Sequence, residues 1–156
     1  MKVHTLDRLL AQHPFFAGLD PDDARFVAGC AVNRVVGADG FLFRAGDPAD
    51  QFCVVRSGRV AVELYAPGRG PLILDTVGEG AVLDAAWLIP PFRWQFDARA
   101  VTPVRFVALD ATCLRARCDE HPALGYRLMQ RTAVIMQARL EAARVRLLDL
   151  YGARRG

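Results

Sequence analysis

The stretch FRAGDPADQFCVVRSGRV (residues 43–60) decides the fold, because it encloses one short apolar run between two turn signals. The first signal is Gly46-Asp47-Pro48, in which the aspartate favours a turn start and the proline presets φ for the second turn position. The second signal is Ser57-Gly58, where glycine can take the positive φ of a tight turn. The stretch therefore predicts a buried strand with a turn at each end.

The same pattern of short strands and turn residues continues on both sides of this stretch, from residue 32 to residue 110. Short apolar or alternating runs are divided by Gly, Pro and Asp at intervals of roughly ten residues. About eight such strands predict an all-β barrel or jelly roll. No βαβ alternation and no glycine-rich loop between strand and helix is present, which argues against nucleotide-binding α/β folds. The predicted strands cover residues 32–36, 40–44, 51–57, 59–65, 72–77, 81–83, 96–101 and 104–109.

Helical patterns flank the predicted barrel. Residues 5–19 read as a short helix and a turn, and Asp20 is a predicted N-cap for a second helix that begins with a proline. After residue 110 we expect a short helix over 111–118 and a long one over 123–151, closed by Gly152. The expectation is a single domain over residues 1–156, with N-terminal helices in 1–31, a barrel in 32–110 and C-terminal helices in 111–156.

The long predicted helix carries an apolar seam with heptad spacing. At 1.5 Å per residue this helix is about 40 Å long, which exceeds the width of a small barrel. We therefore expect a homodimer through residues 123–151, while Leu128, Ile135 and Leu148 widen the stripe towards the barrel. The seam residues are Tyr126, Met129, Ala133, Met136, Leu140, Ala143, Leu147 and Leu150.

Composition indicates an ordinary globular protein, with 53% hydrophobic and 24% charged residues. The net charge of +3 is too small by itself to indicate a nucleic-acid partner. No run is long enough to span a bilayer, and the N-terminus lacks a signal-peptide core, so we expect a cytoplasmic protein without a membrane partner. The basic residues gather at one end, in Arg139, Arg144, Arg146, Arg154 and Arg155.

Signatures of catalysis and metal binding are missing from the sequence. The four cysteines lack CxxC spacing and are expected to be buried, reduced thiols. The three histidines are far apart, so no metal site is predicted. Neither a GxSxG elbow nor an SxxK pair is present, and we expect no enzymatic activity.

Three stretches resemble the cyclic-nucleotide-binding domain family, the sensor half of the catabolite activator (Crp/Fnr) regulators. They are residues 13–19 (HPFFAGL), which resemble the family's opening motif, the stretch 43–60 quoted above, and residues 74–82 (LDTVGEGAV). The resemblance implies a double-stranded β-helix (jelly-roll) barrel followed by a long dimerisation helix. It also implies a single-domain form, since the sequence ends at Gly156 without the family's helix-turn-helix, so that output is expected to reach a protein partner.

The ligand cassette departs from the family pattern. Relatives bind the ribose through a Gly-Glu pair and the cyclic phosphate through an Arg. The Arg suits this role because its charge-assisted hydrogen bonds to phosphate are strong. Aligned through Ala98-Arg99-Ala100, the pair becomes Asp84-Ala85 and the Arg becomes Trp94, with Arg93 one residue away. Ala143 and Arg144 occupy the region of the family's base-reading Thr-Ser pair. The implied ligand-site residues are Val82, Leu83, Asp84, Ala85, Ala86, Arg93, Trp94, Gln95 and Arg144.

The cluster Trp87, Phe92, Trp94 and Phe96 allows two interpretations: aromatic filling of a vacated pocket, or a reshaped pocket for a flatter, less charged ligand. In the second, Arg93, Gln95 and Asp97 would be polar handles. The leading hypothesis is a non-enzymatic sensor that binds a small ligand, cyclic AMP, cyclic GMP or a related compound, and signals through the dimer helix. The alternatives are a ligand-free dimeric scaffold and a nucleic-acid binder through the arginine-rich end.

Overall fold

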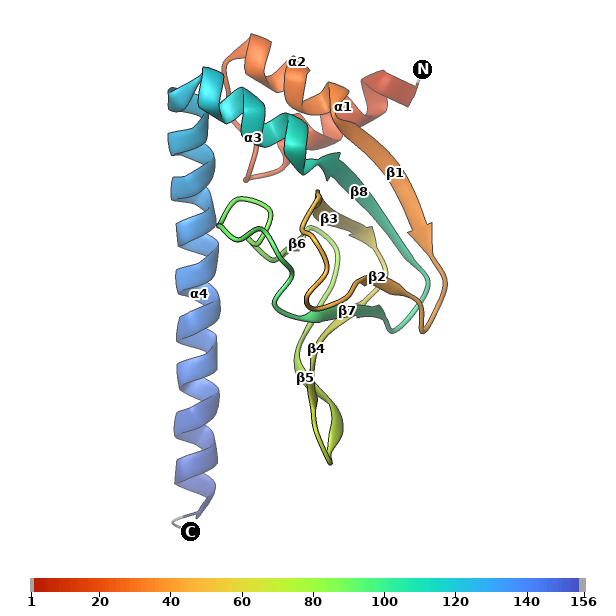
Figure 1. Ribbon diagram of the computed structural model, residues 1–156, viewed down its shortest axis with the longest axis vertical. Coiled ribbons are helices and arrows are strands. Elements are labelled where there is room, and N and C mark those ends of the chain that lie inside the picture. The colour runs from red at the N-terminus through yellow and green to blue at the C-terminus, as the bar shows by residue number, and fades with distance from the viewer. Residues whose placement is uncertain (1, 155–156) are drawn as a thin grey trace.

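The computed structural model describes residues 2–154 and places a β-barrel beside one long helix, with the shorter helices gathered at one end (Figure 1). The eight predicted strands all correspond to observed strands, with bounds that agree to within two residues. In chain order the elements are α1 (Lys2–Gln12), α2 (Pro21–Gly29), β1 (Ala31–Val36), β2 (Phe41–Phe43), β3 (Gln51–Ser57), β4 (Val60–Ala66), β5 (Gly70–Val77), β6 (Val82–Leu83), β7 (Asp97–Ala100), β8 (Val104–Asp110), α3 (Ala111–Glu120) and α4 (Pro122–Arg154).

The strands of the described chain form two four-stranded antiparallel sheets, in the orders β1-β8-β3-β6 and β2-β7-β4-β5. The central strand β3 pairs with β8 in a register that sets Val54 opposite Val107 and Cys53 opposite Ala108. All four side chains are buried in the core. Except for the β4–β5 hairpin, neighbouring strands are distant in sequence, which is typical of a jelly roll. The prediction of a mainly β jelly-roll barrel with flanking helices is confirmed.

The stretch that decided the fold behaves as its turn residues require. Gly46 and Gly58 have φ values of +90° and +94°. A Cβ atom on Gly58 would lie 2.3 Å from the carbonyl oxygen of Pro103, so glycine is needed for space as well as for φ. Between the turns, residues 52–55 are buried without alternation, because β3 is the interior strand of its sheet.

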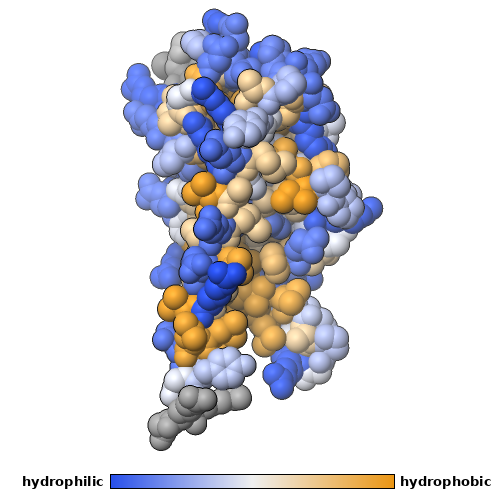
Figure 2. Space-filling model, turned by 90° about the vertical axis from the view of Figure 1, so that its left-hand side faces the viewer, coloured by the Kyte–Doolittle hydropathy of each residue, from blue (hydrophilic) through white to orange (hydrophobic). Residues whose placement is uncertain are grey.

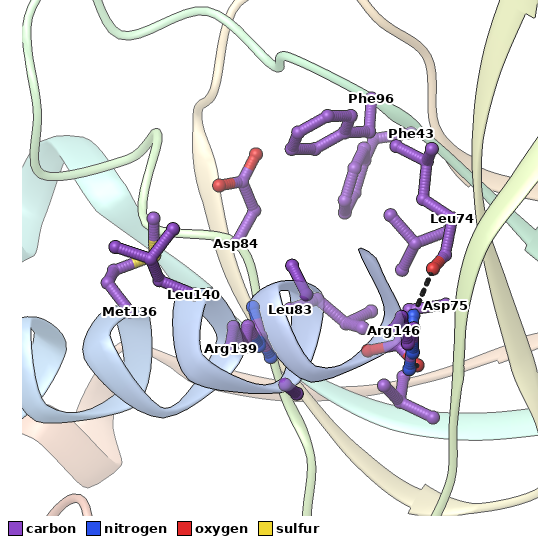
Figure 3. A pocket seen from close by; sticks show the side chains of 14 residues that line it. Phe43, Leu74, Asp75, Leu83, Asp84, Phe96, Met136, Arg139, Leu140 and Arg146 are labelled. Atoms are coloured by element: carbon purple, nitrogen blue, oxygen red, sulfur yellow. Dashed lines mark hydrogen bonds and ion pairs between the residues drawn. The ribbon is translucent and has the colours of Figure 1, made fainter. Parts of the chain in front are cut away.

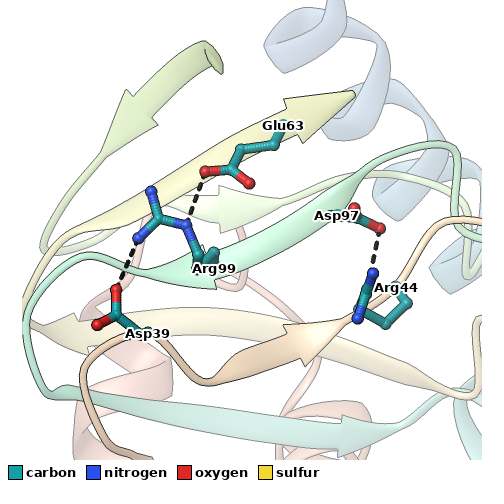
Figure 4. A network of polar contacts seen from close by, with 5 residues as sticks. All are labelled: Asp39, Arg44, Glu63, Asp97 and Arg99. Atoms are coloured by element: carbon teal, nitrogen blue, oxygen red, sulfur yellow. Dashed lines mark hydrogen bonds and ion pairs between the residues drawn. The ribbon is translucent and has the colours of Figure 1, made fainter. Parts of the chain in front are cut away.

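Charged pairs hold the second sheet together (Figure 4). The Glu63 side chain of β4 is nearly inaccessible to solvent and accepts a hydrogen bond from Arg99 Nε at 2.7 Å. The same guanidinium bonds Asp39 at 3.1 Å. Asp97 lies 3.5 Å from Arg44 Nε and accepts a bond from the backbone N–H that follows Arg44. Asp97 thus fixes the end of β2, which differs from its predicted place as a polar handle in the pocket.

Aromatic rings join the N-terminal segment to the barrel. The ring centroid of Phe15 lies 4.9 Å from that of Phe52, which in turn lies 4.8 Å from the centroid of Trp87. Phe16 packs edge-on against Phe15 at 5.1 Å. The segment that resembled the family's opening motif therefore closes one end of the barrel core.

Three details of the predicted helices and thiols are corrected by the structure. Asp20 precedes Pro21 as expected, but its side chain makes no cap hydrogen bond. The helix α4 continues through Gly152 to Arg154, because Gly152 does not take the positive φ of a glycine cap. Cys113 is exposed on the first turn of α3, whereas Cys53 is buried as expected. Within residues 2–154, no helix combines the length and the apolar character that crossing a bilayer demands.

Candidate ligand site

A cavity of about 300 Å³ lies between the barrel and α4 (Figure 3). Its wall is mostly apolar, with four charged residues among the lining side chains. Apolar walls with a few placed polar groups are typical of small-molecule sites. The barrel contributes Phe43, Val62, Leu74, Asp75, Val77, Leu83, Asp84 and Phe96, and α4 contributes Met136, Arg139, Leu140, Ala142, Ala143 and Arg146.

Two arginines of α4 bridge the cavity wall to the barrel. Arg139 donates a hydrogen bond to the Val82 carbonyl, and Arg146 donates to the Leu74 carbonyl at 2.6 Å. Arg146 also bonds Asp75 Oδ1 at 3.1 Å, and Figure 3 shows Arg146 beside Leu74 and Asp75. Burial lowers the pKa of Arg139, an effect that the nearby carboxylates oppose. The guanidinium groups therefore tie α4 to β5 and β6.

Asp84 follows β6 and holds its carboxylate at the wall of the cavity. Its φ is +51°, a left-handed conformation that aspartate tolerates better than most side chains. Oδ1 accepts a hydrogen bond from the Ala85 N–H at 2.7 Å, whereas Oδ2 is buried and has no partner within the described residues. Buried polar atoms are usually paired, so this oxygen marks a position where a partner is missing. No cluster of three or more His, Cys, Asp and Glu side chains suited to a metal occurs in residues 2–154.

Some predicted site residues lie at or beside the cavity. Leu83 and Asp84 line it directly. Val82 and Ala85 line a smaller adjoining hollow of about 10 Å³, which Asp84 and Arg139 share. Ala86 is buried in the same segment, close to these residues in sequence. The segment after β6 is thus the part of the predicted cassette that the structure brings to the cavity.

The other predicted site residues lie elsewhere. Arg93 is exposed and donates to the Gly46 carbonyl at 2.8 Å, beside a bridge to Pro48, and these contacts hold it at the β2–β3 turn. Trp94 is buried behind Phe43, and Gln95 is exposed. Arg144 points to solvent and pairs with Glu141 at 3.0 Å. None of these four predicted residues is among the described side chains that line the cavity, so the structure does not place Arg93 as a substitute phosphate residue.

The predicted aromatic cluster is divided between core and cavity. Trp87 packs against Phe52, and the Trp94 ring stacks on Phe43 with centroids 3.7 Å apart and planes 6° from parallel. Phe92 lies under the Arg115 guanidinium, whose Cζ atom is 4.4 Å from the centroid of the Phe92 ring. Phe96 is the member that lines the cavity, among the described residues. Large rings therefore rebuild the core, as the filling interpretation expects, but they leave the cavity open.

Sequence reasoning missed the charged residues that α4 and β5 bring to the cavity. Arg139 and Arg146 were counted only as part of a basic cluster, and Asp75 only as part of a family-like stretch. A signal was present, because the two arginines are seven residues apart and in phase with Leu128 and Ile135, which were expected to face the barrel.

The predicted basic cluster does not form one surface. Arg139 and Arg146 turn towards the barrel, and Arg144 forms its pair with Glu141. The Arg154 and Arg155 side chains lie outside the described residues. This division of the described arginines gives no support to the nucleic-acid alternative.

Comparisons with known proteins agree with the fold. The model of the cyclic nucleotide-binding domain matches residues 33–121. A CRP-like cAMP-activated global transcriptional regulator of Mycobacterium tuberculosis is 24% identical over 150 residues, which cover 93% of this chain and 63% of the regulator. The chain therefore spans less than two thirds of that relative's length.

Two solved structures show the same architecture. A cyclic nucleotide-binding domain from Methylobacillus flagellatus superimposes with a TM-score of 0.76 and 21% identity, covering 95% of this chain and 83% of that one. The sensor domain of the transcriptional regulator DNR from Pseudomonas aeruginosa gives a TM-score of 0.74 at 19% identity, covering 90% and 94%. By its matched residues and its barrel, this chain belongs to the cyclic nucleotide-binding domain family.

Proposed function

We propose that the chain is a non-enzymatic regulatory sensor module that binds a small ligand in the cavity and passes its occupancy to α4. One observation carries this proposal: the barrel and α4 build the cavity wall together. A ligand that fits one spacing of these two parts better than another shifts the helix in proportion to its difference in affinity. Binding and helix position are then coupled without any catalytic step.

The part of α4 beside the cavity is the part that a ligand can move. Leu124 and Leu128 are buried in the core, but no described residue of α4 beyond Thr132 is buried. Beyond that point, Arg139 and Arg146 attach the helix through hydrogen bonds to backbone carbonyls. Such bonds are exchanged with water at low net cost, because both partners are hydrated when they separate.

The outward face of α4 supports a dimer as the output of the sensor. Large apolar side chains at the end of the predicted seam are exposed there, with Leu147 at 54% and Leu150 at 64%, whereas the seam residues Met136, Leu140 and Ala143 line the cavity instead. Figure 2 shows hydrophobic residues gathered over the C-terminal half of α4 and beside it. An exposed stripe with heptad spacing fits a second copy of the same helix. The receiving partner in this proposal is another protein whose contact depends on the dimer geometry.

Thermal unfolding with a panel of cyclic nucleotides and small aromatic compounds tests the proposal. The M. tuberculosis relative is named as cAMP-activated, so cyclic AMP and cyclic GMP are the first compounds in the panel. A ligand at 100 times its Kd adds about 2.7 kcal/mol to the unfolding free energy, which raises the midpoint clearly.

A pair of variants on the same helix locates the binding. Ala142 lines the cavity and Ala138 does not, although both are exposed residues of α4. Ala142→Trp should fill the cavity and remove the ligand's shift, while Ala138→Trp should keep it. If no compound moves the midpoint, the ligand-free dimeric scaffold becomes the better description.

A further inference from the structure

The charged groups of the cavity wall differ in whether all their buried side-chain atoms have a hydrogen-bond partner. Arg139 donates to Val82, and Arg146 donates to Leu74 and Asp75. The carboxylate of Asp75 is engaged by Arg146 and by the N–H of the next residue at 2.8 Å. Each of these three groups thus has a partner within the protein, and none of them has a buried side-chain atom without one in the described residues.

Asp84 is the exception among the four described charged residues of the wall. One of its oxygens accepts a local backbone hydrogen bond, and the other is buried without a partner. A buried acceptor that lacks a donor costs about 1–3 kcal/mol, and more when it is charged. A ligand that supplies a donor removes this cost.

The carboxylate stands at the boundary of two spaces, since Asp84 lines both the main cavity and the smaller hollow beside Trp87 and Ile135. Figure 3 shows it projecting beside Phe96, on the side of the cavity away from Arg146. Rotation about the terminal side-chain bond of an aspartate is soft. Such a rotation exchanges the oxygen that faces the cavity, so a bound donor can reach either of them.

We infer that the cavity takes a largely apolar ligand with an N–H donor group, neutral or cationic, and that Asp84 accepts its hydrogen bond. The inference rests on the proposed function, because it names the class of ligand for the same cavity. An anionic group is disfavoured in the same position. It would have to share guanidinium groups that already donate to backbone carbonyls, and it would approach the negative charge of Asp84 across a mostly apolar cavity.

Three probes of one shape test this inference on the full chain. Benzamidine joins an aromatic ring to a cationic donor, benzoate joins the same ring to an anion, and toluene supplies the ring alone. Methyl-labelled methionine gives the readout by NMR, because Met136 lines the cavity and Met129 does not. Benzamidine should shift the Met136 methyl signal and leave Met129 unchanged, with a Kd at least about tenfold lower than that of benzoate.

Two isosteric variants identify the acceptor. Asp84→Asn keeps the shape and tolerates the same positive φ, and it should weaken benzamidine binding by about tenfold or more. Asp149→Asn is the matched control, because Asp149 is an exposed aspartate of α4 that does not line the cavity. That variant should bind benzamidine like the parent protein.

The outcomes separate the class of ligand from the existence of the site. If toluene and benzoate move Met136 as strongly as benzamidine does, or if Asp84→Asn binds benzamidine unchanged, the donor class is wrong while the cavity still binds. If none of the three probes moves Met136 at millimolar concentration, the inference fails, and the cyclic-nucleotide panel decides separately whether the proposed function stands.

Discussion

From Pro122 to Ile135, α4 is held by apolar packing, with Leu124 and Leu128 only 2% and 0% exposed, in addition to carbonyl bonds from Arg127 and Arg131. From Met136 onwards the same helix is held by two arginines, with the cavity between it and the barrel. Packing loss cannot be recovered from water, whereas a broken arginine–carbonyl bond is replaced by hydration. One helix is therefore fixed at its start and adjustable along the rest of its length.

This difference explains how a ligand can act on a helix without unfolding the domain. The fixed half joins α3 and the core, where the Gly125 backbone approaches Cys118 so closely that a Cβ on Gly125 would lie 3.2 Å from the Cys118 Cβ. The adjustable half carries the cavity wall on one face and exposed seam residues such as Leu147 on another. In the proposed function, a small change at the cavity wall reaches the exposed seam because a helix is a stiff element.

The largest expected effect comes from breaking the fixed half. Leu128→Ala removes a fully buried side chain and should lower the unfolding free energy by about 2–5 kcal/mol. Leu148→Ala, in the adjustable half, removes a side chain that is 69% exposed and should change it by less than about 0.5 kcal/mol. Urea unfolding of the two variants measures both values. Equal losses would show that the two halves do not differ in packing.

A smaller effect is expected from charging the seam of the adjustable half. The double change Leu147→Glu and Leu150→Glu should weaken self-association by at least about tenfold, because an unpaired carboxylate in an apolar interface costs roughly 2 kcal/mol. The fold should persist, since both side chains are exposed in the single chain. Sedimentation equilibrium gives the association constant.

Val145→Glu is the control for the seam, because Val145 is 54% exposed but lies outside the heptad positions. It should leave the association constant nearly unchanged. A parent protein that stays monomeric at high concentration would contradict the dimer, and with it the proposed route of output.

The barrel and the fixed half were accessible to sequence reasoning because their signals are local. Turn residues such as Gly58 require a particular φ, and an apolar run between two turns has few alternatives to a strand. The stripe through Leu128 and Ile135 likewise indicated a face towards the barrel, but the expectation that Leu148 continues this face was wrong, because Leu148 is 69% exposed. The predicted end of α4 at Gly152 was wrong, because a glycine permits a helix to end but does not force it to end.

The cavity was less accessible, because its chemistry depends on which side chains meet across distant segments. Family alignment pointed to Arg93 and Trp94, but a contact with the Gly46 carbonyl and a stack on Phe43 hold these residues away from it. Arg139 and Arg146 reach the cavity only because α4 lies beside β5 and β6. Asp84 was placed by the alignment, although its unpaired oxygen could be recognised only in three dimensions.

A small effect on stability, but the sharpest test of the contrast within α4, is expected from Arg146→Gln. The side chains of Arg146 and Asp75 are 55% and 35% exposed, so losing their ion pair should change the unfolding free energy by less than about 1 kcal/mol. The amides of residues 140–150 should nevertheless exchange with deuterium several-fold faster, while those of 124–131 keep the parent rate, because local opening depends on local contacts. Arg144→Gln, which removes only an exposed pair with Glu141, should leave both segments unchanged. Unaltered exchange over 140–150 in Arg146→Gln would mean that something other than this arginine holds the adjustable half to the barrel.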